Sequence, residues 1–198
     1  MSNETPSHPR RVATEAGEIE FCLMSPADEA AVLDFAQRLP THDLLFLPRN
    51  ISQPKVLSAW IKEIERGAIT SLLAVKDGTV VGCGTLVRDP HSWSPHVGEI
   101  RMVVSEDVRG KGVGRALSQA TFALALGAGL EKLSVQMTVD QQAAIALFES
   151  LGFKAEALLR DHVRDVDGRK HDIVVLGHNV AQVRAQMEAY GLPDAVQH

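Results

Sequence analysis

Hydrophobic residues recur along this chain with two periods, and each period predicts a different kind of element. Residues 133–139 alternate between apolar and polar side chains, which predicts a strand with one buried face. Residues 113–126 place Val113 and Leu117 on one stripe of a helix that should end at Gly127. The same reasoning predicts further strands at 20–24, 69–76, 79–87, 97–104, 155–166 and 170–178, and helices at 25–39, 55–66, 141–151 and 180–190.

Two Asp-Gly pairs indicate tight turns between neighbouring strands. Asp77-Gly78 and Asp167-Gly168 each separate two β-rich runs, and this dipeptide favours a two-residue hairpin turn. The predicted order is therefore β-α-α-β-β-β-α-β-α-β-β-α. A mixed, mainly antiparallel sheet with helices on its faces accommodates this order better than a doubly wound parallel sheet does. We expect an α+β fold, with residues 41–54 as an ordered loop.

Length and composition favour one domain with additional segments at its ends. The 198 residues are 45% hydrophobic and 23% charged, which is typical of a soluble globular protein. Residues 1–18 are polar and are expected to form a flexible lead-in to a domain at 19–179. Residues 180–198 are expected to form a C-terminal helix and tail. The apolar stripe of that helix suits docking on the domain or on a second subunit, so a homodimer is one alternative.

Several classes of function receive no support from the sequence. No apolar run reaches the roughly 18 residues of a membrane span, and residues 1–18 do not resemble a secretory signal, so we expect a cytoplasmic location and no membrane partner. A net charge of −5 argues against nucleic acid. Cys22 and Cys83 fit small buried hydrophobes. The His, Cys and Asp residues lack metal-ligand spacing, so no metal is expected.

The most informative stretch leads from a predicted strand into a glycine-rich helix start, Arg109-Gly110-Lys111-Gly112-Val113-Gly114-Arg115. A helix N-terminus carries unpaired N–H groups and about half a positive charge, and glycine lets an anion approach them closely. Three cations at this end would oppose the helix dipole unless an anion binds. The stretch therefore predicts a phosphate or pyrophosphate cradle. The alternative is a tight turn with a solvated charge cluster.

The two commonest phosphate-binding motifs do not fit this stretch. The nucleotide P-loop pattern is absent, and the dinucleotide pattern starting at Gly110 would need glycine at position 115. The stretch instead resembles motif A of the GNAT superfamily of N-acetyltransferases, Gln/Arg-x-x-Gly-x-Gly/Ala, through Arg109, Gly112 and Gly114. Residues 141–153, from Gln141 to Phe153, resemble its motif B. The resemblance spans about residues 19–179.

This resemblance implies a three-layer α/β/α fold that binds acetyl-coenzyme A. Strands 97–104 and 133–139 would splay apart, and the pantetheine arm would lie in the gap. Backbone groups of Met102 and Val104 would pair with the arm, and a backbone N–H there could polarise the thioester carbonyl. The full set of cofactor-binding residues is then expected to be Met102, Val103, Val104, Arg109, Gly110, Lys111, Gly112, Val113, Gly114, Arg115, Gln141 and Phe148.

Acetyl transfer to an amine requires a base, because an ammonium ion has no lone pair. Glu99 lies in an otherwise apolar strand just before the cofactor loop and is the expected general base. The alternative is a glutamate that faces solvent or pairs with Arg101. His96 is a candidate relay or second base, unless residues 91–96 form only a surface loop anchored by Trp93. The acceptor would be a small molecule or a peptide carrying an amine.

The sequence lacks the usual proton donor for the leaving thiolate. Many GNAT enzymes have a tyrosine where this chain has Phe148, which cannot donate a proton. A thiol pKa of ~8.5 still makes the thiolate a tolerable leaving group. We therefore expect direct transfer without an acetyl-enzyme. A non-catalytic acyl-coenzyme A sensor and a transferase of longer acyl chains are the alternatives. The loops 41–54 and 91–96 should border the acceptor, whose identity stays open.

Overall fold

The structure is a computed structural model that describes residues 9–181, and it contains one eight-stranded sheet. The strands lie in the order β1-β2-β3-β4-β5-β6-β8-β7. Among the strands of residues 9–181, only β5 and β6 pair in parallel, so the sheet is mixed and mainly antiparallel, as predicted. The strands are β1 (Arg10–Thr14), β2 (Gly17–Leu23), β3 (Ile69–Lys76), β4 (Thr79–Arg88), β5 (Val97–Val104), β6 (Lys132–Thr138), β7 (Lys154–Arg164) and β8 (Lys170–Asn179).

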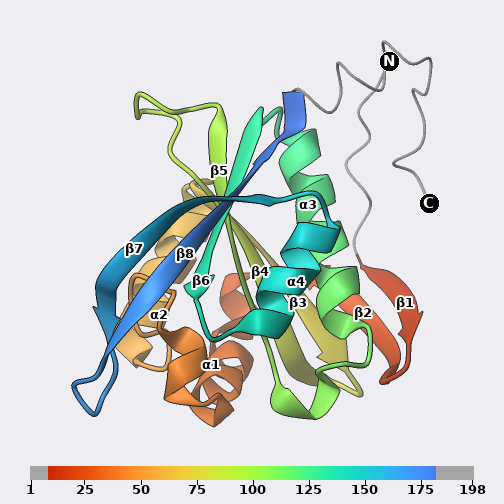
Figure 1. The fold of residues 1–198 in the computed structure, drawn as a ribbon. Coiled ribbons are helices and arrows are strands. Elements are labelled where there is room, and N and C mark those ends of the chain that lie inside the picture. The colour runs from red at the N-terminus through yellow and green to blue at the C-terminus, as the bar shows by residue number, and fades with distance from the viewer. Residues whose placement is uncertain (1–8, 182–198) are drawn as a thin grey trace.

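Helices cover both faces of the sheet, which confirms the α+β class (Figure 1). Figure 1 shows α3 and α4 on one side of the sheet and α1 and α2 on the other. The α-helices are α1 (Glu29–Arg38), α2 (Pro54–Glu65), α3 (Val113–Gly127) and α4 (Gln142–Ser150). Three short 3₁₀ helices are η1 (Pro26–Asp28), η2 (Thr41–Leu44) and η3 (Glu106–Val108). Within residues 9–181, no helix combines the length and apolar character needed to cross a membrane.

The sequence analysis was wrong about the start of the chain. Residues 10–14 form strand β1, which pairs antiparallel with β2, so residues 10–18 are not a flexible lead-in. β1 was missed because it is an edge strand with few partly buried side chains, of which Val12 is one. Such a strand shows little alternation of apolar and polar residues. The predicted element order lacked this strand. Of the helix predicted at 180–190, Val180 and Ala181 are helical and the rest lies outside the described residues.

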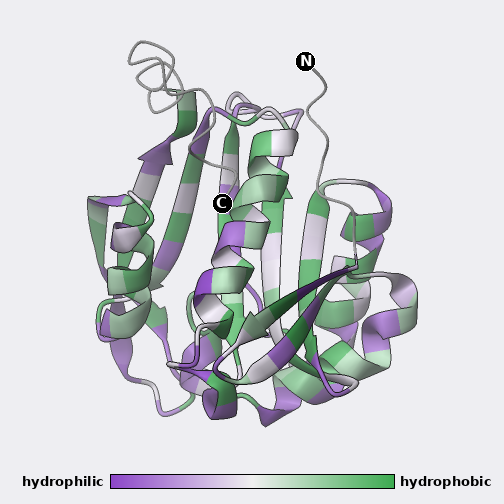
Figure 2. Ribbon diagram, turned by 90° about the vertical axis from the view of Figure 1, so that its right-hand side faces the viewer, coloured by the Kyte–Doolittle hydropathy of each residue, from purple (hydrophilic) through white to green (hydrophobic). Residues whose placement is uncertain are grey.

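The hydrophobic core is divided between the two faces of the sheet. One cluster packs Val32 and Phe35 of α1 and Leu57 of α2 against the strands. Two clusters on the other side pack α3 and α4 against the sheet. Figure 2 shows mainly hydrophobic residues in the central strands. Cys83 belongs to this core, as predicted, and burial raises the pKa of its thiol to about 12.

Strand β5 contributes alternate side chains to the two faces. Ile100 and Met102 pack on the α3 and α4 side, whereas Val103 packs with α1 and α2. Because successive side chains of a strand point to opposite faces, Glu99 and Arg101 share the α1 and α2 face with Val103. This alternation decides which side of the sheet each candidate residue can serve.

His178 of β8 is a polar side chain within the apolar layer beneath α3. Its ring contacts those of Phe122 and Phe153, with centroid separations of 5.2 and 5.1 Å. Its Nδ1 atom is buried and has no hydrogen-bond partner among the described residues. Burial disfavours the charged imidazolium and lowers the pKa of His178 below its ordinary value.

This lowered pKa predicts a pH-dependent stability. The unfolded chain, whose histidine pKa is about 6.5, binds the proton more readily than the folded chain. The free energy of unfolding should therefore have its full value above about pH 6.5 and decrease as the pH falls below that value. Urea unfolding between about pH 7.5 and pH 5.5 should show a smaller decrease for His178→Phe than for the wild type. His162→Gln, at an exposed position in β7, is the control. An identical decrease in all three proteins would contradict the prediction.

Candidate active site

Strands β5 and β6 pair over only part of their length. Their parallel register runs from Val97 opposite Lys132 to Ile100 opposite Val135 and stops there. Beyond this point β5 continues to pair with β4 through Val104, and β6 continues to pair with β8 through Thr138. The two strands therefore diverge after Ile100, at the place where the sequence predicted a splay.

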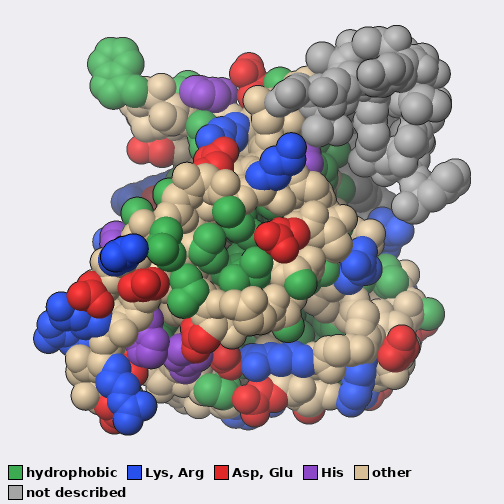
Figure 3. Space-filling model, viewed as in Figure 1, with side chains coloured by type: hydrophobic (Ala, Val, Ile, Leu, Met, Phe, Trp, Pro, Cys, Tyr) green, Lys and Arg blue, Asp and Glu red, His purple; other side chains and the backbone are tan. Residues whose placement is uncertain are grey.

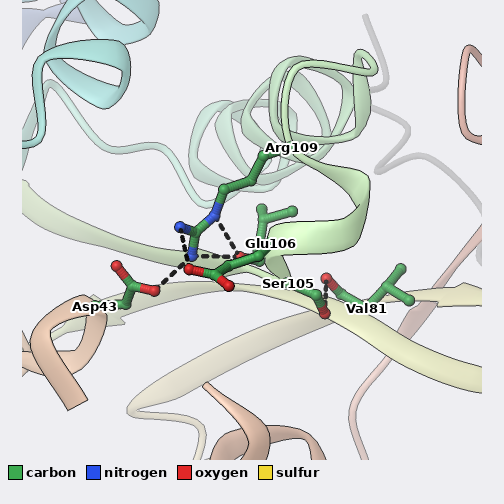
Figure 4. Close-up of polar contacts among 6 residues, drawn as sticks. Asp43, Val81, Ser105, Glu106 and Arg109 are labelled. Atoms are coloured by element: carbon green, nitrogen blue, oxygen red, sulfur yellow. Dashed lines mark hydrogen bonds and ion pairs between the residues drawn. The ribbon is translucent and has the colours of Figure 1, made fainter. Parts of the chain in front are cut away.

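Backbone groups of β5 point into the gap that this divergence leaves. The N–H of Ser105 donates to the carbonyl of Val81 at 2.9 Å, on the β4 side (Figure 4). Backbone groups alternate in direction along a strand, so Val104 and Met102 direct their N–H and C=O groups away from β4. Those groups face the gap, where the register with β6 has already ended.

A narrow apolar cavity of about 50 Å³ lies in this gap. Such a cavity is far smaller than the ~300 Å³ of a typical small-molecule pocket, so it suits an unbranched segment of a ligand. Its walls come from the two diverging strands, from α4 and the turn before it, and from one loop residue. The lining residues are Phe46, Ile100, Met102, Val135, Gln136, Met137, Gln141, Ala144 and Phe148.

Three of these lining residues were expected from the sequence, namely Met102, Gln141 and Phe148. The side-chain Oε1 of Gln141 accepts a hydrogen bond from the N–H of Thr138 at 3.2 Å, which closes the turn between β6 and α4. Phe148 is 4% exposed and makes an edge contact with Phe153 at a centroid separation of 5.2 Å. Gln141 thus holds the turn that borders the cavity, and Phe148 forms part of the cavity's apolar wall.

The N-terminus of α3 presents its backbone openly at the end of the loop that follows β5. Gly110 and Gly112 have φ angles of 70° and 84°, in the left-handed region that favours glycine. Gly112 is the N-cap, and the first helical hydrogen bond joins the N–H of Ala116 to its carbonyl. The N–H groups between these two residues therefore have no partner within the helix. A Cβ atom at Gly110 would meet nothing within 4 Å, so this backbone is accessible.

The side chains around these N–H groups differ in what they contribute. Lys111 and Arg115 are both exposed. Lys111 Nζ donates to the carbonyl of Asp107 at 2.7 Å, and Arg115 Nη2 donates to Ser150 Oγ at 3.1 Å. Val113 is fully buried, so only its backbone is available to a ligand. Val103 likewise turns its side chain into the core beside α1 and α2. The cations and the open backbone together form a surface suited to a phosphorylated ligand.

Arg109 turns away from the helix end and connects three parts of the site (Figure 4). Its Nη2 lies 2.6 Å from Asp43 Oδ2 in η2. Its Nε and Nη2 also donate to the carbonyl of Val104 at 3.1 and 2.9 Å. This guanidinium therefore satisfies one backbone group of the gap and holds the loop after α1 beside the loop after β5.

The neighbouring residue His42 holds η2 to the other flank of the gap. Its Nε2 lies 2.8 Å from Asp140 Oδ2, just after β6. Its ring makes an edge contact with that of His171, with centroids 5.2 Å apart, and His171 Nε2 lies 2.8 Å from Asp165 Oδ2. Figure 3 shows histidines at the lower left of an apolar patch on this face. The 41–54 loop was expected to border the acceptor, and these contacts were not predicted.

Glu99 and Arg101 form a bidentate ion pair on the α1 and α2 face of β5. Arg101 Nε and Nη2 donate to the two carboxylate oxygens at 2.8 and 3.0 Å. The Glu99 side chain is 25% exposed and the Arg101 side chain is 21% exposed. His96 is exposed, and its carbonyl accepts from the N–H groups of Glu131 and Lys132. No hydrogen bond joins His96 to Glu99 in the described part of the chain.

Comparison with known proteins agrees with this arrangement. A model of the acetyltransferase (GNAT) family matches residues 36–153. That match covers more than half of the chain, so the protein belongs to the acetyltransferase (GNAT) family. Among residues 9–181, no group of three or more His, Cys, Asp or Glu side chains is arranged to hold a metal ion.

Individual relatives are more distant. An IAA acetyltransferase of Azospirillum brasilense is 35% identical over 47% of this chain, and the match covers 60% of that relative. The solved structure of a GNAT-family acetyltransferase from Streptococcus pneumoniae is 20% identical, with a TM-score of 0.71 over 81% of this chain and 99% of that one. An acetyltransferase structure from Salmonella typhimurium with its cofactor acetyl-CoA is 20% identical, with a TM-score of 0.70 over 82% and 94%.

The helix end gives a direct test of anion binding. Replacing Gly112 by aspartate should weaken acetyl-coenzyme A binding about 10-fold or more, because a carboxylate would stand beside the pyrophosphate. Gly112→Asn is the matched control, since asparagine has the same shape and also tolerates a positive φ. Titration calorimetry should show a much larger loss for aspartate than for asparagine. Equal dissociation constants for the two variants would show that the anion binds elsewhere.

Proposed function

We propose that this protein transfers an acetyl group from acetyl-coenzyme A directly to a primary amine, with Glu99 as the general base. The observation that supports it most is the divergence of β5 from β6 beside the glycine-rich start of α3. A ligand arm with an unbranched end and a diphosphate would then find adjacent sites on one continuous stretch, residues 102–115. Acetyl-coenzyme A combines both chemical features in one molecule.

The residues present fit this cofactor. The N–H groups of Gly110 to Arg115 would hold the pyrophosphate, with Lys111 and Arg115 balancing its charge. The free backbone groups of Met102 and the N–H of Val104 would pair with the amides of the arm in the manner of an added strand. Gln141 and Phe148 would line the arm's apolar part. When bound, acetyl-coenzyme A supplies an acetyl group activated as a thioester, whose carbon–sulfur bond breaks as the amine's lone pair attacks.

The proton of the attacking amine has an acceptor within the same strand. The strand register favours Glu99 as this acceptor. It lies opposite Ser134, one residue before the pairing of β5 with β6 ends. Its carboxylate lies against Arg101 and can take the proton directly or through one water molecule. Phe148 has no proton to donate, so the departing thiolate is protonated by solvent. With a thiol pKa of ~8.5, this departure does not require an enzymatic acid.

A sensor that binds acyl-coenzyme A without turnover is the second candidate. The absence of a hydroxyl at the buried Phe148 ring is the observation that favours it. The acetyltransferase function is better supported, because a sensor would have no use for a half-buried carboxylate on the acceptor face of β5.

Turnover kinetics separate the two functions. The Glu99→Gln variant should lose about 100-fold or more in kcat and retain its affinity for acetyl-coenzyme A, because the base and its ion pair with Arg101 are lost while the backbone groups that would hold the cofactor are unchanged. Raising the pH should restore part of this loss, since the free amine then forms in solution. Glu149→Gln, exposed on α4, is the control and should behave as the wild type. If the wild type binds acetyl-coenzyme A but releases no thiol with any amine, the sensor function is correct.

A further inference from the structure

The Glu99–Arg101 pair leaves one edge of the guanidinium available. Arginine carries five N–H donors, which form two edges that can each bind a carboxylate with two parallel hydrogen bonds. Glu99 occupies the edge formed by Nε and Nη2. No described residue accepts a hydrogen bond from Nη1, and the arginine side chain is 21% exposed. The edge formed by Nη1 and Nη2 can therefore receive a second carboxylate.

The position of this edge in the fold relates it to the reaction. Ile100 is the last residue of β5 that pairs with β6, so Arg101 is the first residue beyond the end of the pairing. Glu99 lies on the paired side of that point, and both side chains share the α1 and α2 face. The cavity residues Ile100 and Met102 alternate with them along the same strand. An acceptor molecule that reaches the strands where they part would meet both charges.

We propose that the acceptor is a small molecule that carries a carboxylate next to its amine, namely a free α-amino acid. The acceptor's carboxylate binds the open edge of Arg101, and its amine lies against Glu99. This inference rests on the proposed acetyltransferase function and specifies its substrate class. In this arrangement Arg101 is a specificity-determining residue, and its guanidinium can keep Glu99 in place while it holds the acceptor.

Charge balance favours such a ligand over a simple amine. Glu99 and Arg101 together have no net charge, and neither does an amino acid with its ammonium and carboxylate groups. The two pairs can therefore associate with each charge opposite its counterpart, and no unpaired charge is left in a half-buried position. A simple amine would satisfy Glu99 alone. A protein N-terminus has an amide where the amino acid has its carboxylate, so it would leave the open edge of Arg101 unused.

Paired substrates test this proposal directly. Steady-state thiol release is measured with a panel of L-amino acids and with the corresponding L-amino acid amides, which differ only in the charged group. The wild type should show a kcat/KM about 10- to 100-fold higher for the acid than for the amide of its best substrate, the range expected for hydrogen bonds to a charged group. The amide's amine is the less basic of the two, so a larger fraction of it is unprotonated near neutral pH, which acts against this preference.

Two variants at position 101 and one control locate the effect. Arg101→Gln should reduce the ratio of acid to amide to about one while the amide is still turned over, which shows that the variant is folded. Arg101→Lys keeps the charge without the planar edge and should retain only part of the preference. Arg88→Gln removes a charge from the adjacent strand β4, opposite Gly98 and on the other face, and should leave the ratio unchanged.

The failure of this inference can be told apart from failure of the proposed function. If the wild type acetylates amides or other amines as well as amino acids, or if Arg101→Gln keeps the wild-type ratio, the carboxylate does not bind Arg101 and the pair only stabilises β5. The acetyltransferase function then stands. If no amine of any kind is acetylated although acetyl-coenzyme A binds, the proposed function itself is wrong.

Discussion

The central structural constraint is the loss of pairing between β5 and β6 after Ile100 and Val135. Backbone N–H and C=O groups need hydrogen-bond partners, and a sheet normally provides them from the neighbouring strand. Here β6 follows β8 and β5 follows β4, so the groups of Met102 and Val104 face a gap. Arg109 satisfies the carbonyl of Val104 from within the chain. The remaining groups are suited to a ligand that takes the place of a strand.

The same divergence organises the rest of the site. The chain leaves β5, turns through η3 and enters α3, so the gap and the open helix end are only a few residues apart. The short helix η2 contacts both flanks of the gap. Asp43 pairs with Arg109 after β5, and His42 pairs with Asp140 after β6. Arm, anion and acceptor would therefore all be positioned relative to the point at which two strands separate.

Much of the fold could be predicted because its signals are local. Strand β5 was predicted with its observed bounds, and the glycines before α3 identify a turn that requires positive φ. Strand β1 was missed because an exposed edge strand has few buried side chains to create a pattern. The Asp43–Arg109 contact joins residues 66 positions apart, and no periodicity encodes such a pair. The Glu99–Arg101 pair was foreseen as an alternative, but its free edge depends on geometry that the sequence alone does not give.

Amide hydrogen exchange measured residue by residue tests most directly whether acetyl-coenzyme A replaces the missing strand. On addition of acetyl-coenzyme A, the amides of Met102 and Val104 and those between residues 110 and 115 should exchange more slowly, because they gain hydrogen-bond partners. Amides in β7, at the far edge of the sheet, should be unaffected. Saturation with acetyl-coenzyme A without any protection at residues 102–115 would contradict the account.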